Sequence, residues 1–300
     1  MQRTGKRKIR LLGFLAAPAM LFWGCGVGRA QEPPYFVTYS HAMEEPGNLE
    51  TEFKGTQASP KNVNAFGGAT VEFEYGAKAW WTTEVYLSGQ TTANDSTIFT
   101  GFRWENRFRP LLGEHWINPV LYFEYEDANN SDRSFLEITG NQSVSDLLLT
   151  NAQGRSDVER EMEMKLILSS NAKGWNFSEN FITEKNLSPT EGEPWEFGYA
   201  LGTSRPLSLK AGATECVFCR EHFAAGAELY GGLGTIDSFG LKATSHYLAP
   251  TAGWELPRGP KITFSPGFGL NDNSVKVLWR VGLQYEFQQF FSRFHRGEAH

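Results

Sequence analysis

An alternation of residue types near the C-terminus, from Val275 to Phe287, limits the possible folds more strictly than any other part of the chain. A period of two over thirteen residues predicts a β-strand with one apolar and one polar face. The apolar face would carry Val275, Val277, Trp279, Val281, Leu283, Tyr285 and Phe287, and the polar face Lys276, Arg280, Gln284 and Glu286. Such a strand fits a barrel wall between lipid and a polar lumen, although a strand of a soluble sandwich alternates in the same way.

Three further segments repeat this pattern, and in each of them the polar face is charged. Their apolar faces are Val71, Phe73 and Tyr75; Phe102, Trp104 and Phe108; and Met162, Met164, Leu166 and Leu168. Their charged faces are Glu72 and Glu74; Arg103, Glu105, Arg107 and Arg109; and Glu161, Glu163 and Lys165. Acids and arginines on facing strands can pair across a barrel interior, which favours a lumen over the outer face of a sandwich.

The strand count points to a closed barrel. Eight other segments are predicted as strands: 48–55, 80–88, 116–126, 175–186, 194–204, 222–231, 241–248 and 262–270. With the four above, the total is about twelve, an even number as bacterial barrels require, although 35–41 is an alternative first strand. We therefore predict an all-β, antiparallel transmembrane barrel over residues 47–287.

The connections offer an independent check, because such barrels have short periplasmic turns and longer outer loops. Short connections are predicted at 76–77, 110–114, 171–173 and 257–260, and longer ones at 56–64, 89–96, 127–157, 187–193 and 232–239. The exception is 205–221, a long segment on the predicted periplasmic side, which either departs from the rule or hides a miscounted strand.

The N-terminus carries a secretory signal. Basic residues from Arg3 to Arg10 precede an apolar run, Leu11–Trp23, that is too short to span a bilayer as a helix. Small residues then end at Ala30, which predicts a signal peptide over 1–30 and a mature chain from Gln31; Cys25 as a lipoprotein cysteine is the alternative. Residues 31–46 are assigned to an N-terminal periplasmic segment and 288–300 to a C-terminal tail.

Charge and cysteine content exclude several classes. The net charge is −6 and no basic cluster lies beyond the signal, which disfavours nucleic-acid binding. The two cysteines of the mature chain, Cys216 and Cys219, are spaced for a local disulfide in an oxidising compartment. A zinc site is the weaker interpretation because no second cysteine pair exists, and haem attachment lacks the histidine that would follow Cys219. No cofactor is predicted.

Two resemblances add to this interpretation. Residues 280–287 resemble the C-terminal insertion signal of outer-membrane proteins through Gly282, Tyr285 and Phe287, which implies handling by the barrel-assembly machinery; unlike many such proteins, the chain continues to His300. The segments 116–122, 168–175, 244–250 and 264–270 resemble a family of uncharacterised bacterial outer-membrane barrels. That family is loosely similar to the barrels of aromatic-degradation operons, the MetA-pathway-of-phenol-degradation-like transporters, which implies passage of small hydrophobic compounds and no catalytic residues.

The candidate functional residues are charges expected to face the lumen. They are Glu72, Glu74, Glu84, Arg103, Glu105, Arg107, Glu124, Glu161, Glu163, Lys165 and Arg280, together with Arg109 and Glu126. They could form a charge-selective constriction, in which the excess of acids would favour cations, or they could neutralise one another and plug a narrow barrel.

Two other constellations are weaker. Ser245 and His246 could belong to a hydrolase, but neighbours in a strand point to opposite faces, so the serine would have to come from another strand. His41, Glu44 and Glu45 could ligate a metal, yet a turn or a periplasmic plug is the preferred interpretation of their segment.

The sequence as a whole predicts a porin-like channel in the bacterial outer membrane for small solutes, hydrophobic or cationic, with membrane lipid as its other partner. The alternatives are a structural or adhesive barrel with a plugged lumen, a barrel-embedded lipid hydrolase, and a soluble periplasmic sandwich. Oligomeric state is not predicted.

Overall fold

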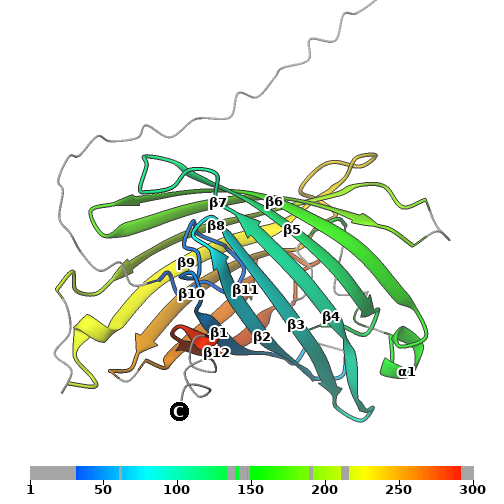
Figure 1. The fold of residues 1–300 in the computed structure, drawn as a ribbon. Helices are drawn as coiled ribbons and strands as arrows, with labels where there is room; N and C mark the ends of the chain where they lie inside the picture. Colours follow the sequence, from blue (N-terminus) through cyan, green and yellow to red (C-terminus); the bar gives the residue numbers. More distant parts are fainter. Residues whose placement is uncertain are drawn as a thin grey trace, which may run out of the picture.

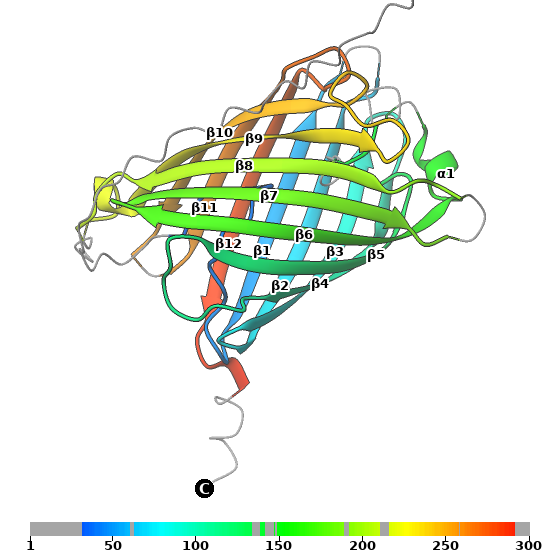
Figure 2. The same cartoon turned by 90° about the horizontal axis from the view of Figure 1, so that it is seen from above.

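A computed structural model describes residues 32–60, 63–133, 139–141, 147, 149–188, 192–210, 216–257 and 259–291. The predicted signal peptide, Cys25 and most of the C-terminal tail lie outside these residues. Within them, twelve antiparallel strands form a closed barrel (Figures 1 and 2). The strands are β1 (Leu49–Ala58), β2 (Phe66–Lys78), β3 (Trp81–Thr92), β4 (Thr97–Phe108), β5 (Asn118–Asn129), β6 (Val158–Ala172), β7 (Trp175–Asn186), β8 (Glu196–Pro206), β9 (Phe223–Thr235), β10 (His246–Glu255), β11 (Lys261–Gly269) and β12 (Val277–Phe287).

Each strand pairs with its neighbours along the chain, and β1 closes the barrel against β12 through the register Leu49↔Phe287 to Ala58↔Leu278. The predicted fold class and the count of twelve are therefore confirmed. One strand is displaced: β10 runs from His246 to Glu255, whereas the sequence predicted 241–248. Pro250 lies within β10 and pairs with Ala227 of β9.

The connections separate into two ends of the barrel. One end carries residues 79–80, 109–117, 173–174, 207–210, 216–222, 256–257 and 259–260 together with both chain ends of the barrel, and we take it as the periplasmic end. The other end carries the longer loops, including 130–157, which contains the short helix α1 (Asn151–Gly154). The long periplasmic segment hides no further strand among its described residues; it contains a single 3₁₀ turn at Arg220–His222.

The outer face of the wall is apolar. Side chains such as Phe73, Trp104, Phe181, Trp279 and Leu283 point outward, and 40–51% of each is exposed. A continuous belt of this kind is not sustained in water but suits hydrocarbon. The apolar faces point outward and the charged faces inward, which excludes the sandwich and defines an outer-membrane β-barrel. No helix in the described part of the chain is long and apolar enough to cross a membrane.

Aromatic residues gather at the periplasmic end of the wall. Trp80 and Trp81 stack on each other and on Phe108, with ring centroids 6.3 Å apart. Tyr285 and Phe287 lie at the same end, where their rings meet edge-on at 4.8 Å. Such a band is expected at the level of the lipid headgroups, where aromatic rings are favoured.

Candidate functional site: an occluded lumen

The predicted charges face the lumen and are largely paired. Arg107 lies among three carboxylates: Nε is 2.8 Å from Glu105, Nη2 is 3.5 Å from Glu84, and Nη2 also contacts Glu74. Only 7% of Arg107 is exposed. Because several carboxylates surround one guanidinium, this group is held together by ion pairs rather than left as a ring of free charges.

A second arginine repeats the arrangement towards the long loops. Arg103 donates two hydrogen bonds to Glu126, of which the Nη2–Oε1 bond is 2.8 Å, and lies 3.8 Å from both Glu124 and Asp132. Asp132 belongs to the loop 130–157, so this arginine ties that loop to the barrel wall.

The remaining predicted charges form smaller contacts. Lys54 binds Glu72 at 2.7 Å, Lys165 binds Glu163 at 2.7 Å, and Arg280 donates to the Tyr230 hydroxyl at 2.5 Å. Glu161 lines an acidic hollow near the long loops with Glu159, Glu184, Glu193 and Glu196. Arg109 is the exception: it lies beyond β4 and binds the carbonyl oxygens of Leu111 and Gly113 in the β4–β5 turn.

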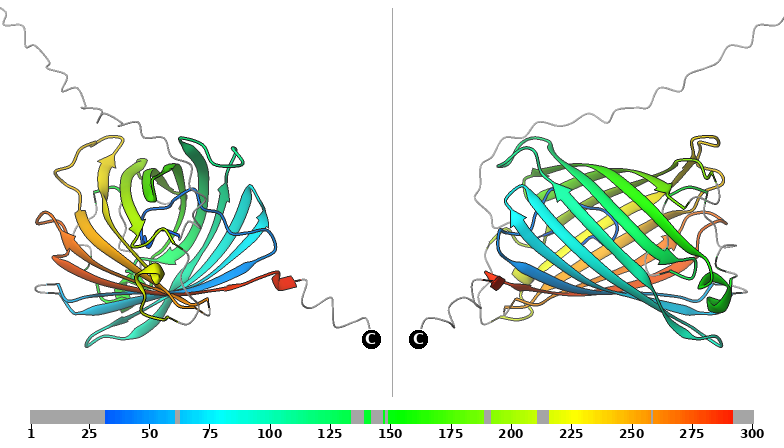
Figure 3. Two further views of the ribbon diagram at one scale, coloured as in Figure 1. Left: turned by 90° about the vertical axis from the view of Figure 1, so that its left-hand side faces the viewer. Right: turned by 45° about the vertical axis from the view of Figure 1, so that its right-hand side comes forward.

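The N-terminal segment runs through this network inside the barrel (Figure 3, blue). Residues 31–46 were assigned to the periplasm, yet the described part of that range contacts lumen-facing side chains of five strands. One Glu228 carboxylate accepts hydrogen bonds from the backbone N–H groups of Phe36, Val37 and Thr38, at 3.0, 2.9 and 2.7 Å. The described part of the segment therefore lies in the lumen.

Asn180 holds the next residue from both sides. Its amide oxygen accepts the N–H of Tyr39 at 2.6 Å, and its amide nitrogen donates to the carbonyl of Tyr39 at 2.9 Å. Gly202 provides space beside the segment, because a Cβ there would lie 2.7 Å from the ring of Tyr35 and 2.9 Å from Thr38. The segment also bonds to β7 through a side chain, since Tyr35 donates to Asn176 at 3.0 Å.

Tyr39 occupies the centre of the charged layer. Its hydroxyl lies 3.1 Å from Glu105 and 3.1 Å from the hydroxyl of Tyr86, and its ring meets Tyr122 edge-on at 5.1 Å. The Lys165 ammonium lies 4.7 Å from the centre of the Tyr39 ring, and the Arg107 guanidinium lies 5.4 Å from it. Two cations over one ring contribute electrostatic attraction in addition to the packing.

The proposed metal ligands of the segment are separated rather than gathered. Both ring nitrogens of His41 are occupied, Nδ1 by Ser169 at 2.8 Å and Nε2 by Glu114 at 3.0 Å. Glu44 is buried elsewhere, and a carboxylate oxygen of it has no hydrogen-bond partner among the described residues. Nowhere in the described ranges do three or more His, Cys, Asp or Glu residues cluster as a metal site.

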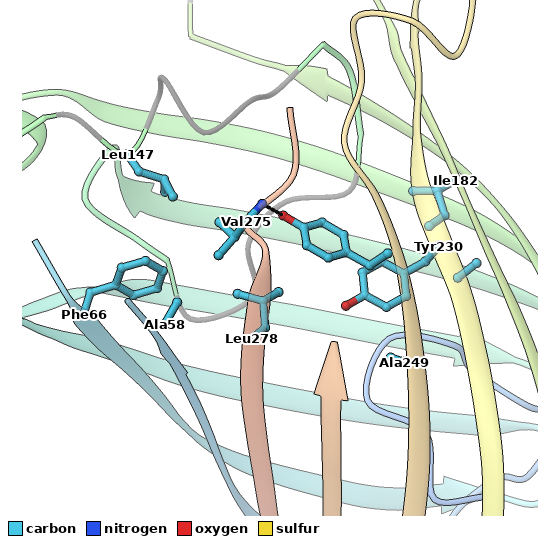
Figure 4. Packing of buried hydrophobic residues seen from close by; sticks show 10 residues of the cluster. Ala58, Phe66, Leu147, Ile182, Tyr230, Ala249, Val275 and Leu278 are labelled. Atoms are coloured by element: carbon cyan, nitrogen blue, oxygen red, sulfur yellow. Dashed lines mark hydrogen bonds between the residues drawn. The ribbon is translucent and has the colours of Figure 1, made fainter. Parts of the chain in front are cut away.

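An apolar cluster occupies part of the outer half of the lumen. It contains Ala58, Phe66, Leu147, Ile182, Ala200, Tyr230, Tyr247, Ala249, Val275 and Leu278 (Figure 4). Leu147 comes from the loop 130–157 and Val275 from the β11–β12 loop, where its N–H donates to the Tyr247 hydroxyl at 2.9 Å. Two loops therefore fold inward and complete an apolar layer above the charged one.

Sequence reasoning missed Glu228, Asn180, Tyr39 and Tyr122 as lumen residues. Glu228 was detectable, because it is the one carboxylate in a strand whose other inward residues, Ala224, Gly226 and Tyr230, are uncharged. No periodic pattern in the sequence could indicate that Tyr39 faces the lumen, since its segment contains no regular secondary structure.

The remaining predicted features keep local positions. Gly282 faces inward, while Tyr285 and Phe287 face outward at the periplasmic end, so handling by the assembly machinery stays a prediction. Cys216 and Cys219 are joined by a disulfide with a Cα–Cα distance of 5.5 Å. His246 contacts the hydroxyls of Tyr199 and Thr244, at 3.1 and 2.9 Å.

Comparisons with known proteins add the fold alone. No family model matches the chain, and no curated protein does. An outer-membrane channel of Pseudomonas putida F1 superposes with a TM-score of 0.52 at 10% identity, covering 82% of this chain and 97% of that one. The KdgM porin in complex with disordered oligogalacturonate gives 0.45 at 9% identity, with 80% and 99% covered. LpxR from Salmonella typhimurium gives 0.38 at 8%, with 79% and 99% covered.

Proposed function

We propose that this protein is an outer-membrane channel for small solutes and that residues 32–46 close it from the periplasmic side. The proposal rests on the kind of contact that holds this segment in the lumen. Its backbone is bound by the side chains of Glu228 and Asn180, and among the described residues no strand of the barrel pairs with residues 32–46. Hydrogen bonds of this kind exchange readily with water, so the segment can leave without disrupting the wall.

Two features favour particular solutes. The inward carboxylates outnumber the inward cations, and the acidic hollow lies at the long-loop mouth, so an opened lumen would favour cations. The apolar layer favours small uncharged aromatic compounds instead, in agreement with the loose resemblance to barrels of aromatic-degradation operons. The hydrolase alternative receives less support, because His246 meets hydroxyl groups and the Leu241 carbonyl rather than a carboxylate.

Deleting residues 32–46 tests the proposal. We expect the full-length mature protein to stay closed in planar bilayers and the deletion variant to show discrete conductance steps, with a reversal potential in a KCl gradient that indicates cation preference. A gel shift between boiled and unboiled samples must first show that both proteins form barrels. A folded deletion variant that never conducts would refute the channel and leave the structural or adhesive barrel.

Closure is also expected to depend on pH through Glu44. Burial, together with the nearby Glu74, Glu286 and Glu32 carboxylates, raises the pKa of Glu44 to about 8, from an ordinary value of 4.5. The protonated carboxyl therefore favours the seated segment; this contribution is complete below pH 4.5 and is lost as the pH rises through 8.

The open probability should consequently increase between about pH 4.5 and 8, and this increase should be absent in Glu44→Gln. Burial lowers the pKa of His41 below its ordinary 6.5, so His41 titrates at lower pH than Glu44 does. Recordings of both proteins across the window provide the check, and an identical pH profile for the two would rule out Glu44 as the titrating group.

A further inference from the structure

The lumen binds the main chain of residues 36–39. Glu228 accepts three consecutive N–H groups, those of residues 36–38, and Asn180 binds both the N–H and the C=O of Tyr39. These two side chains come from β9 and β7, and 1% of each is exposed. Contacts of this kind use only groups that every peptide has, apart from proline nitrogens. A segment of different sequence would therefore find the same partners.

Inward glycines make room for this chain along its course. A Cβ on Gly76 of β2 would lie 2.2 Å from the carbonyl oxygen of Glu45 and 2.7 Å from that of Glu44. A Cβ on Gly253 of β10 would lie 2.9 Å from the ring of Pro34. A larger residue at either position would displace the chain, because real Cβ atoms do not approach other atoms so closely. The wall is thus shaped to admit a polypeptide.

One side chain of the four is recognised through hydrogen bonds. The Tyr39 hydroxyl contacts Glu105 and the hydroxyl of Tyr86, each at 3.1 Å. The Thr38 hydroxyl has no hydrogen-bond partner among the described residues, and the two residues before it have hydrocarbon side chains. The site therefore specifies a phenol at the fourth residue and is less selective at the first three.

We propose that this part of the lumen is a peptide-binding site, in which residues 36–39 take the place of a solute, and that the channel transports short peptides with tyrosine as the fourth residue. The proposal rests on the channel function above and names its substrate class. The tethered segment competes at an effective concentration of roughly millimolar, so the channel stays closed until peptides accumulate.

The first test measures binding to the refolded protein that lacks residues 32–46. Tetrapeptides with acetylated N-termini and amidated C-termini are titrated by calorimetry, which requires no conductance. Phe-Val-Thr-Tyr reproduces residues 36–39, and Leu-Ile-Ser-Tyr changes its first three side chains but retains their polarity. We expect the affinities of the two peptides to agree within about tenfold, because the main-chain contacts are common to both and the side-chain volumes are similar.

The matched control removes the donors and leaves the side chains. Leu-Ile-Ser-Tyr with a methyl group on the first three backbone nitrogens has nothing to donate to Glu228, and we expect its affinity to be at least about tenfold lower. In Glu228→Ala the methylated and unmethylated peptides should bind equally. Should that variant fold poorly, Asn180→Ala provides a second measurement, in which both peptides lose the contacts of the tyrosine main chain but the effect of methylation persists.

Transport is followed as entry of radiolabelled Leu-Ile-Ser-Tyr into proteoliposomes that contain the full-length mature protein. Above the concentration at which the tethered segment is displaced, the unmethylated peptide should enter and the methylated one should not.

Three results would overturn the proposal: binding of Phe-Val-Thr-Tyr alone, equal affinities for the methylated and unmethylated peptides, or binding without entry. The first would show that the lumen recognises only its own segment. Failure of the channel itself is seen separately, as a deletion of 32–46 that folds and binds peptide but does not conduct.

Discussion

Replacing Glu228 by alanine is expected to raise the open probability of the channel about a hundredfold. One carboxylate accepts three backbone N–H groups from Phe36, Val37 and Thr38, and the methyl side chain of an alanine would accept none of them. Hydrogen bonds to a charged group contribute about 1.5–3 kcal/mol each, but released N–H groups regain water. A net loss of about 3 kcal/mol corresponds to about a hundredfold shift from the seated to the released segment.

Single-channel recording of the variant beside the full-length protein and the deletion of 32–46 measures this shift. Glu228→Gln is the matched control, because its amide oxygen still accepts while its charge is lost, and we expect an effect of about tenfold. If Glu228→Ala stayed as closed as the wild type while the deletion conducted, the segment would be held chiefly by Asn180 and the contacts of Tyr39.

Removing the guanidinium of Arg107 is expected to destabilise the barrel by about 3–5 kcal/mol, the range found when one member of a buried charge group is removed. Glu74, Glu84 and Glu105 would then face one another without their shared cation. Urea unfolding of refolded Arg107→Ala, followed by tryptophan fluorescence, provides the measurement. Acid pH should reduce the difference from wild type, because protonated carboxyls no longer repel one another.

Two comparisons separate charge from packing. Arg160→Ala removes a partner of Asp127 at 3.2 Å, but the Arg160 side chain is 59% exposed, so its loss should cost less than about 1 kcal/mol. Adding Glu105→Gln to Arg107→Ala should recover part of the stability by removing one of the unpaired charges. A loss as small for Arg107→Ala as for Arg160→Ala would show that the buried group does not stabilise the barrel.

The wall could be predicted because each strand repeats the same contrast every two residues. In β12, the apolar Trp279 faces lipid and the charged Arg280 faces the lumen. Strands β2, β4 and β6 show the same alternation. The one displaced strand, β10, shows the limit of this reasoning. A proline ends a strand only if its nitrogen faces a partner that needs the hydrogen bond, and in β10 that partner is another proline.

The candidate site was predictable in part. The inward position of Arg103, Arg107 and their acids followed from the alternation, whereas their grouping around two arginines depended on which strands became neighbours. The binding of the N-terminal segment by Glu228 could not be inferred, since the residues it joins lie 190–192 positions apart in the sequence.

The amino-acid sequence alone specified the number of strands, the face that each side chain takes and hence the membrane environment. Successive residues of a strand face opposite sides, so the contrast between a lipid-facing and a lumen-facing side is visible within each strand. The positions of residues 32–46 in the lumen, of two loops in an apolar layer and of Pro250 opposite Pro266 emerged only from the folded barrel. These outcomes depend on barrel closure, which brings distant strands together at distances that no local pattern encodes.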